Sequence, residues 1–320
     1  MISSLRSAGN YTHSHMHLHP AISAINPQPS PLEYLPLSSA KNAGIEVRIK
    51  RDDLLGADIQ GNKWRKLKYS LSDYLSRGVD HVATFGGPYS NHHFAFSAAC
   101  SILSLNFTLF VRGYESLPLT DTLRFCQSKG GRIIFLSAAD YRRKTDPDFQ
   151  QDLIRRYGPF ALLPEGGTQE LAYKGLAELV EELPDDYTHL CAPVGTGGTI
   201  TGLAKAVKGK AEVWGFSTLL GIQKMTEQLR IASGNSQLRI FQDEEKKGYA
   251  RLTKAQALYI QHFWETYQLL LDPLYTGPMM KRIEEGIVAG LFPPGSRLIV
   301  IHTGGIQGWC GFPHHHPQAV

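Results

Sequence analysis

The sequence has little cysteine, and its cysteines do not form the spaced pairs that bind zinc or exchange disulfides. Cys100, Cys126, Cys191 and Cys310 lie far apart, and no CxxC motif occurs among them. Neither a zinc ribbon nor a redox dithiol is therefore indicated. Because disulfides form mainly in oxidising compartments, this cysteine usage favours a reducing, cytoplasmic one.

Long apolar runs and a strong charge of one sign are also absent. No apolar run reaches about 18 residues, the length typical of a membrane-spanning helix, and the first 20 residues lack the apolar core of a signal peptide. The 33 basic and 29 acidic residues leave a net charge of +4. The basic run 65–68 is short and has no aromatic repeat around it. We therefore expect neither a membrane nor a nucleic acid as partner.

Histidines gather at both ends of the chain. His13, His15, His17 and His19 occupy alternate positions, so in an extended segment they would point the same way and could hold a soft metal. A disordered tail is the alternative interpretation, and the run 314–316 presents the same choice. We expect no metal site.

From residue 45 onward, short apolar stretches alternate with stretches of helical periodicity. Strands are expected at 45–49, 81–85, 107–111, 132–136, 160–163, 189–193, 213–216 and 298–302. Helices are expected from about residue 63 and at 91–103, 121–128, 149–157, 169–183, 200–207, 252–267 and 278–289. This alternation predicts an α/β fold with parallel strands and helices on both faces of the sheet.

Lys63 lies where a turn meets a helix. Gly61 and Asn62 are turn formers, and Leu67 and Leu71 follow at helical spacing. The helix dipole disfavours a positive charge in the first turn, and the basic run 65–68 adds repulsion. Both effects favour a neutral amine, which is a Schiff-base nucleophile. A basic surface helix is the alternative interpretation.

The loop Gly195-Thr196-Gly197-Gly198-Thr199 ends a predicted strand and opens a helix. Its free N–H groups and the helix dipole can bind an anion such as phosphate, so a side chain at Gly197 should weaken cofactor binding more than stability. It is not a Walker loop, because no Gly-Lys-Ser/Thr follows. Ile200 stands where a dinucleotide fingerprint has its third glycine. A plain tight turn remains the alternative.

Other predicted strand ends carry small and polar residues, at 86–91, 165–168 and 303–305. Ligands of open parallel sheets bind at this edge. Asn91 could donate to a ring hydroxyl or a carboxylate, and Ser90 could carry a proton, although both residues are equally suited to cap a helix. No Gly-x-Ser-x-Gly elbow is present, so a hydrolase serine is not expected. Tyr275, in a tight turn, could face the ligand or pack beneath a loop.

A Schiff-base lysine, a phosphate loop and polar strand ends together indicate pyridoxal 5'-phosphate. Over about residues 30–308 the chain resembles the family of 1-aminocyclopropane-1-carboxylate deaminase and D-cysteine desulfhydrase, within the tryptophan synthase β-type pyridoxal enzymes. The resemblance rests on five motifs that follow one another in the family's order, at 61–67, 86–92, 195–199, 272–277 and 302–305.

The resemblance implies a fold-type II pyridoxal phosphate enzyme with two open, twisted, mostly parallel sheets flanked by helices. It implies a smaller domain, 66–166, inserted into a larger cofactor-binding domain, 1–65 and 167–320, with the site between them, and a homodimer. Lys63 would carry the cofactor as a Schiff base, and Asn91 would bond its 3-hydroxyl. Ser90 would lie near the substrate carboxylate, and the 195–199 loop would hold the phosphate.

Tyr275 would also stand near the substrate, as would Tyr249 by a weaker match, since the family has Gly-Tyr-Gly where this chain has Gly248-Tyr249-Ala250. Ring-opening deaminases of the family carry glutamate at the position of Thr276, facing the pyridine nitrogen, and tend to carry leucine at Thr303. Two hydroxyls here imply a weaker electron sink, which suffices for α,β-elimination of a thiolate.

The expected reaction therefore converts D-cysteine, or a similar small amino acid, to pyruvate, ammonia and sulfide. A 1-aminocyclopropane-1-carboxylate deaminase and a non-catalytic protein that binds an anionic metabolite are the alternatives.

Overall fold

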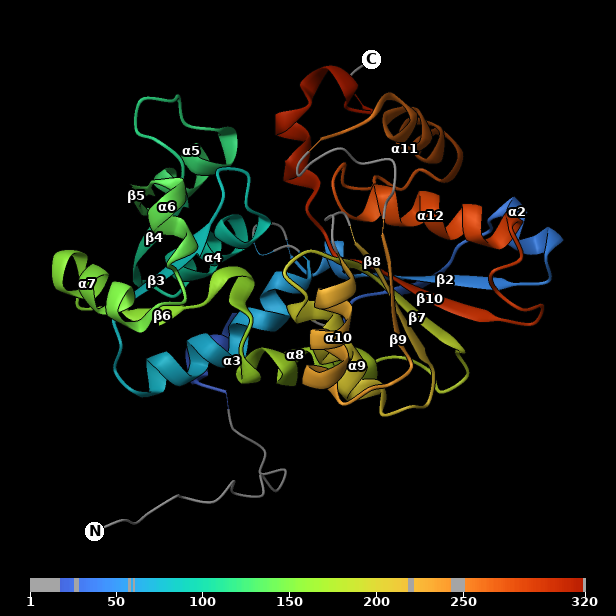
Figure 1. The fold of residues 1–320 in the computed structure, drawn as a ribbon, viewed down its shortest axis with the longest axis horizontal. Coiled ribbons are helices and arrows are strands. Elements are labelled where there is room, and N and C mark those ends of the chain that lie inside the picture. The colour runs from blue at the N-terminus through green and yellow to red at the C-terminus, as the bar shows by residue number, and fades with distance from the viewer. Residues whose placement is uncertain are drawn as a thin grey trace, which may run out of the picture.

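The computed structural model describes residues 18–25, 29–56, 59, 61–217, 222–242 and 251–318. Within them the strands form two sheets (Figure 1). The larger sheet has the order β1 (Leu32–Tyr34), β2 (Glu46–Arg51), β10 (Arg297–His302), β7 (His189–Val194), β8 (Glu212–Ser217), β9 (Leu238–Gln242). The smaller sheet has the order β5 (Arg132–Leu136), β4 (Asn106–Arg112), β3 (His81–Gly86), β6 (Ala161–Leu163).

Strand pairing is parallel throughout both sheets except between β1 and β2, which are antiparallel. The α-helices of the described residues are α1 (Pro20–Ile25), α2 (Ser38–Asn42), α3 (Asn62–Ser76), α4 (Asn91–Ile102), α5 (Asp121–Ser128), α6 (Ala138–Arg142), α7 (Pro147–Tyr157), α8 (Glu170–Glu181), α9 (Gly198–Val207), α10 (Ile222–Ser233), α11 (Lys254–Tyr267) and α12 (Thr276–Val288). Short 3-10 turns are η1 (Asp52–Leu54), η2 (Glu165–Gly167), η3 (Ile306–Gly311) and η4 (Pro313–His315).

Helices cover both faces of the larger sheet, with α11 and α12 on one side and α8, α9 and α10 on the other (Figure 1). The predicted α/β architecture with two mostly parallel sheets is thus confirmed. The sequence prediction missed α10 and β9, and the shorter α1, α2, α6 and β1. Three to six residues contain too few periodic positions for recognition. Helix α10 has twelve residues and a helical pattern that could have been recognised.

The smaller sheet uses strands from 81–163, which falls inside the stretch predicted as the smaller domain. Helix α3 crosses the predicted boundary at residue 66. Its Leu67 and Leu71 pack in the apolar cluster of the smaller sheet, while the helix also packs along α8. Helix α3 therefore joins the two parts, and the domain boundaries stay a prediction.

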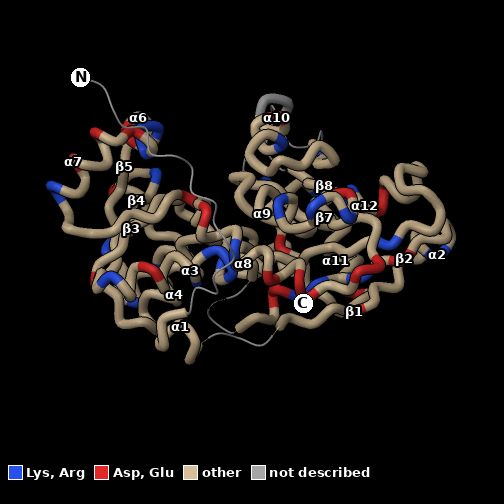
Figure 2. The backbone as a smooth tube through the Cα atoms, turned by 90° about the horizontal axis from the view of Figure 1, so that it is seen from below, with Lys and Arg blue, Asp and Glu red and all other residues tan. Residues whose placement is uncertain are grey.

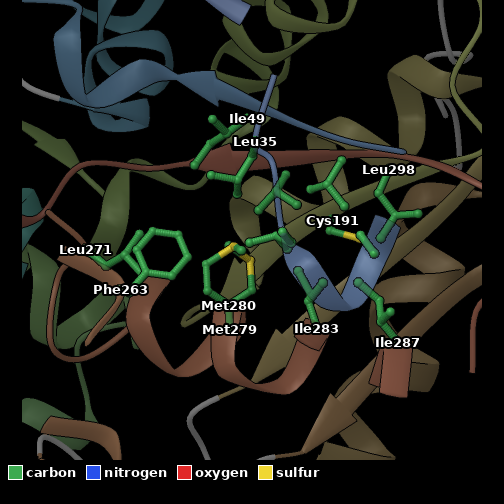
Figure 3. Packing of buried hydrophobic residues seen from close by; sticks show 14 of the residues in the cluster. Leu35, Ile49, Cys191, Phe263, Leu271, Met279, Met280, Ile283, Ile287 and Leu298 are labelled. Carbon is green, nitrogen blue, oxygen red and sulfur yellow. The ribbon is translucent and has the colours of Figure 1, made fainter. Parts of the chain in front are cut away.

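One face of α12 closes the core of the larger sheet (Figure 3). Met280 and Ile283 are fully buried against Ile49 of β2, Cys191 of β7 and Leu298 of β10. Burial of each aliphatic side chain contributes about 1.5–3 kcal/mol. This packing fixes the start of α12, where Tyr275 and Thr276 lie, relative to the strand ends.

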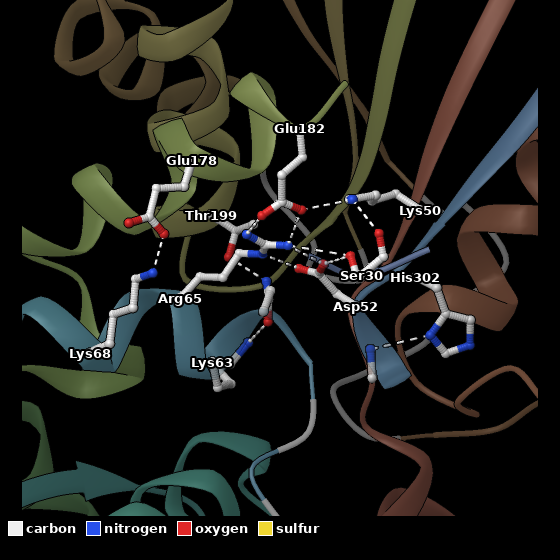
Figure 4. A network of polar contacts seen from close by, with 12 residues as sticks. Ser30, Lys50, Asp52, Lys63, Arg65, Lys68, Glu178, Glu182, Thr199 and His302 are labelled. Carbon is white, nitrogen blue, oxygen red and sulfur yellow. Dashed lines mark hydrogen bonds and ion pairs between the residues drawn. The ribbon is translucent and has the colours of Figure 1, made fainter. Parts of the chain in front are cut away.

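A buried ionic network holds the first turn of α3 (Figure 4). The Arg65 guanidinium donates to both carboxylate oxygens of Asp52 at 2.8 and 2.9 Å, and to both of Glu182 at 2.8 Å. Lys50 also pairs with Glu182, at 2.7 Å, and Ser30 donates to Asp52 at 2.7 Å. Arg65 and Asp52 are 3% and 0% exposed. The network therefore ties α3 to η1 and to the residue that ends α8, and Arg65 and Asp52 at its centre are shielded from solvent.

Lysine and arginine are interspersed with aspartate and glutamate over both parts of the molecule (Figure 2). None of the helices in the described ranges is long and apolar enough to cross a membrane. Across the same ranges, no group of three or more His, Cys, Asp or Glu side chains is placed to hold a metal ion. His13, His15 and His17 lie outside the described residues.

We predict that Arg65→Ala lowers the free energy of unfolding by about 3–5 kcal/mol, because it leaves Asp52 buried without its partner. The matched control is Arg77→Ala at the C-terminal end of the same helix, because this arginine pairs with Asp73 but is 64% exposed. That change should cost no more than about 0.5 kcal/mol. Urea unfolding followed by circular dichroism measures both, and equal losses would show that the buried network does not stabilise α3.

Candidate functional site

The turn before Lys63 packs against the end of β10. Gly61 has a φ of 75°, and a Cβ there would collide with the Thr303 carbonyl oxygen. The Asn62 N–H donates to that same oxygen at 3.3 Å. Only glycine satisfies both the left-handed backbone and the close approach. The first turn of α3 is thus held directly over the carboxyl end of β10.

The Lys63 amine reaches the glycine loop through one intermediate side chain. Lys63 Nζ donates to Asn62 Oδ1 at 2.9 Å, and Asn62 Nδ2 donates to Thr199 Oγ1 at 2.8 Å (Figure 4). Asn62 is 2% exposed, so this connection is shielded from water. The structure therefore brings together two of the motifs singled out in the sequence, 61–67 and 195–199.

Burial lowers the pKa of Lys63 to about 8, and the nearby charge of Asp272 partly opposes this shift. The expected direction is thus seen, but the main cause differs from the one we inferred from the sequence. Arg65 is neutralised by its carboxylates, and Lys68 pairs with Glu178. Desolvation, rather than a crowd of unpaired cations, favours the neutral amine.

The glycine loop forms the N-terminus of α9. Gly198 faces inward: a Cβ there would overlap Thr168 Oγ1 and lie 2.7 Å from Lys66 Nζ. Gly197 has a φ of 86° and faces outward, since its Cβ would lie 2.6 Å from Leu229 Cδ2. A side chain at Gly197 would therefore strain the fold itself. A side chain at Gly198 would strain the fold as well. The expectation that a change at Gly197 affects cofactor binding more than stability stays a prediction.

Lys66 is a residue that the sequence analysis did not assign to the site. It is 1% exposed and donates to Thr168 Oγ1 at 3.0 Å. Across the described ranges no carboxylate forms an ion pair with it. Burial and the charge of Lys63 hold its pKa well below the ordinary lysine value. Its spacing of three from Lys63, which places both on one helix face, was the available signal.

These groups fit the phosphate arm of pyridoxal phosphate. A helix N-terminus binds anions through its free N–H groups and its dipole. Lys66 adds a buried amine without a carboxylate partner among the described residues, and a phosphate beside it would favour the protonated form. Gly198 lets the backbone of the loop lie directly against Thr168 and Lys66, because a Cβ there would overlap both side chains. Lys63 supplies an amine of lowered pKa a short distance away. The residues present would thus hold both the aldehyde and the phosphate of the cofactor.

Ser90 and Asn91 begin α4 and face the end of the larger sheet. Ser90 Oγ accepts the His93 N–H at 3.2 Å, so the residue does cap the helix. Asn91 Oδ1 accepts from Gln307 Nε2 of η3 at 2.5 Å. Asn91 Nδ2 lies 2.5 Å from the point that a Cβ on Gly305 would occupy. The amide therefore sits at the junction of the two sheets, with its orientation set by Gln307.

Tyr275 and Thr276 precede and begin α12. The Tyr275 ring lies against the glycine loop, since a Cβ on Gly195 would be 3.2 Å from its Cε1. The Thr276 hydroxyl donates to Asp272 Oδ2 at 2.8 Å and accepts the Asp272 N–H at 2.8 Å. Its proton is thus engaged locally. That Thr276 faces the pyridine nitrogen stays a prediction, and Tyr249 lies outside the described residues.

We predict that capture of pyridoxal phosphate by the apoprotein rises about tenfold per pH unit below pH 8 and levels off above it. Only the neutral amine attacks the aldehyde, and the pKa of Lys63 is lowered to about 8. An ordinary lysine would keep accelerating to a pH of about 10.4. Stopped-flow absorbance measures the rate, with Lys63→Ala as the blank. A rate still rising tenfold per unit at about pH 9 would contradict the lowered pKa.

We predict that Lys66→Met weakens binding of pyridoxal phosphate by about 10- to 100-fold, the range expected for a lost charged hydrogen bond. Binding of pyridoxal, which lacks the phosphate, should change little. Lys205→Met is the matched control on α9, because Lys205 pairs with Glu170, which is 82% exposed. Fluorescence titration gives the affinities, and equal weakening for both ligands would remove Lys66 from the phosphate site.

Comparison with known proteins places this geometry in a family. A Pyrococcus abyssi protein named as a candidate 1-aminocyclopropane-1-carboxylate deaminase is 31% identical, over 88% of this chain and 91% of its own length. The Arabidopsis thaliana bifunctional D-cysteine desulfhydrase/1-aminocyclopropane-1-carboxylate deaminase is 26% identical, over 96% of this chain and 81% of its own length.

The fold is likewise similar to a solved structure. The crystal structure of a homologue of 1-aminocyclopropane-1-carboxylate deaminase covers 93% of this chain and 98% of its own, with 26% identity and a TM-score of 0.77. The family model described as pyridoxal-phosphate dependent enzyme matches residues 25–304. The chain therefore belongs to the family of pyridoxal-phosphate-dependent enzymes, with pyridoxal phosphate as its cofactor.

Proposed function

We propose that the enzyme catalyses α,β-elimination on a small amino acid, most of all D-cysteine, releasing pyruvate, ammonia and sulfide. The observation that carries this proposal is the Lys63 amine, whose pKa desolvation lowers to about 8, next to the glycine loop and Lys66. A neutral amine at this position can take a proton from the substrate. Its neighbours provide the anion site that holds the cofactor in reach.

In the proposed reaction, the Lys63 amine accepts the proton from the substrate α-carbon, and the β-carbon–sulfur bond breaks as the thiolate departs. The enamine that remains is hydrolysed to pyruvate and ammonia, so no external oxidant or reductant is needed. Pyridoxal phosphate supplies the electron sink that stabilises the negative charge at the α-carbon. Burial keeps Lys63 in its proton-accepting form near pH 8.

The remaining site residues are assigned to binding. Asn91, oriented by Gln307 at 2.5 Å, would donate to the cofactor's 3-hydroxyl. Ser90 would meet the substrate carboxylate. Tyr275, whose ring lies on the glycine loop, and Tyr249 would enclose the substrate from the side of the larger sheet. The division into domains 66–166 and 1–65 with 167–320, with the site between them, is part of the same proposal.

Thr276 and Thr303 favour thiolate elimination over cyclopropane ring opening. A carboxylate that faces a pyridine nitrogen keeps that nitrogen protonated and strengthens the electron sink. Here the Thr276 hydroxyl is neutral, and it gives its proton to Asp272. A weaker sink is adequate when the leaving group is a thiolate. The relative named as a bifunctional enzyme carries both activity names, so ring opening is the first alternative.

A protein that keeps the fold and binds an anionic metabolite without catalysis is the second alternative. We also propose that the enzyme is a homodimer and that it works in the cytoplasm. Cys100, Cys126 and Cys191 are buried free thiols, which suits a reducing compartment.

We predict that the purified enzyme releases sulfide from D-cysteine faster than it acts on L-cysteine, D-serine or 1-aminocyclopropane-1-carboxylate. Lys63→Ala should abolish turnover with an unchanged circular dichroism spectrum, because no other amine replaces the base. Parallel assays of pyruvate and sulfide, with ketobutyrate for ring opening, give the rates. Borohydride reduction and peptide mapping should place the pyridoxyl label on Lys63.

Three results would count against the proposal. Ring opening faster than sulfide release from D-cysteine would favour the deaminase and overturn the interpretation of Thr276 and Thr303. A pyridoxyl label on another lysine would overturn the assignment of Lys63. A coloured, cofactor-loaded protein that turns over none of the four compounds would favour the non-catalytic alternative.

A further inference from the structure

His93 is a buried histidine whose ring nitrogens make no hydrogen bond with the described residues. It lies in the first turn of α4 and is 0% exposed. Within the described part of the chain, neither ring nitrogen has a hydrogen-bond partner. An unmet buried donor or acceptor costs about 1–3 kcal/mol. An apolar side chain of similar size would fill the space without this cost, so the polar ring calls for an explanation beyond packing.

Ser90 is a polar side chain that lies beside the His93 ring at Gly86. A Cβ on Gly86 would lie 2.7 Å from His93 Nε2 and 2.8 Å from Ser90 Oγ. The two atoms thus flank the same point, which is open only because residue 86 is glycine. A hydrogen bond between them would form where the two side chains close on this point, which no Cβ occupies. Gly86 ends β3, so this contact lies at the strand end that carries Asn91.

We propose that His93 is a positioning residue for Ser90: its Nε2–H donates to Ser90 Oγ and directs the serine proton toward the substrate carboxylate. This inference rests on the proposed function, in which Ser90 meets that carboxylate. The chemistry of a hydroxyl decides the direction. Ser90 Oγ has two lone pairs and one proton, and the His93 backbone N–H already occupies one lone pair at 3.2 Å.

When His93 Nε2–H donates to the remaining lone pair, Ser90 Oγ can no longer accept a hydrogen bond and can only donate its proton. A carboxylate accepts and cannot donate, so a hydroxyl held in this way matches the substrate's anionic end. The ring can keep this role across the working pH range, because burial lowers the pKa of His93 to about 3 and keeps it neutral. His93 therefore orients the serine and is not itself a base in the reaction.

Three substitutions of His93 in the cofactor-loaded enzyme test the contact. In His93→Phe, a ring without nitrogen, the dissociation constant for D-alanine should rise about tenfold, a loss of one hydrogen bond by the usual conversion. D-alanine has the carboxylate but no leaving group, so its binding is read from the cofactor absorbance without turnover. In His93→Gln the amide nitrogen takes the place of Nε2, and affinity should return to within about threefold. In His93→Asn the amide takes the place of Nδ1, so affinity should stay low.

Ser90→Ala should weaken D-alanine binding by about as much as His93→Phe, and the double variant should be no worse than either, because the two residues act as one unit. Ser101→Ala, an exposed serine on the same helix, is the control and should change nothing. Thermal unfolding of each variant separates lost positioning from lost packing. Additive effects of the two changes, or equal affinities of His93→Phe and His93→Gln, would overturn the proposal.

The ring itself gives a readout that does not depend on any substrate. In a long-range ¹H–¹⁵N spectrum of the full-length holoenzyme, His93 should carry its proton on Nε2, with the signal assigned by its loss in His93→Gln. That resonance should shift in Ser90→Ala and stay in place in Ser101→Ala. A proton on Nδ1, or no shift in Ser90→Ala, overturns the contact whatever the enzyme turns over. An intact contact in a protein without turnover would instead count against the proposed function alone.

Discussion

The ion pairs of Arg65 are the constraint on which the site depends. Asp52 and Glu182 lie 13 and 117 residues away in the chain, and both accept hydrogen bonds from its guanidinium at 2.8–2.9 Å. The Arg65 guanidinium reaches both carboxylates only when the first turn of α3 has this one position, because a buried charge without its partner is costly. Lys63 lies two residues before Arg65 and Lys66 one residue after it, so their positions follow from the same anchor. Gly61, packed on the Thr303 carbonyl, fixes the turn from the other side. Strand ends, helix and amines are thereby held in one arrangement.

The network also divides the cations of one helical turn into two kinds. Arg65 is fully paired, whereas Lys63 and Lys66 share one face and are paired with no carboxylate in the described residues. Burial lowers the pKa of both amines and so favours their neutral forms, and the charge of Lys63 adds to this effect at Lys66. A phosphate next to Lys66 would reverse the balance there, because an anion within a few ångströms raises the pKa of an amine. Lys63 would keep its lowered value, since burial is its main cause. The same turn of helix can thus offer one amine as an anion ligand and the other as a nucleophile.

Much of this site could be predicted from the sequence, because its motifs are local. A few neighbouring residues are enough to recognise the turn before Lys63, the glycine loop 195–199 and the polar strand ends. The structure brings them to one place. The partners of Arg65 could not be predicted, since no local pattern specifies a contact across 117 residues. The same limit explains why the lowered pKa of Lys63 was attributed to its neighbours in sequence rather than to burial. Lys66 was overlooked for another reason: its role depends on Thr168 and Gly198, which only the fold places next to it.

Asp272 is a buried carboxylate that shapes the turn at the start of α12. It accepts the backbone N–H groups of Leu274, Tyr275 and Thr276 and the Thr276 hydroxyl, all at 2.6–2.9 Å. Every one of these bonds stabilises the turn that begins α12, so the carboxylate has little capacity left to receive a further proton donor. Its charge still reaches Lys63, whose pKa it raises against the larger effect of burial. The Thr276 hydroxyl donates its proton to Asp272. Neither side chain then offers a free carboxylate that would keep a pyridine nitrogen protonated. In the proposed function, where Thr276 faces the pyridine nitrogen, the start of α12 would give a modest electron sink, which suits a substrate whose leaving group departs readily.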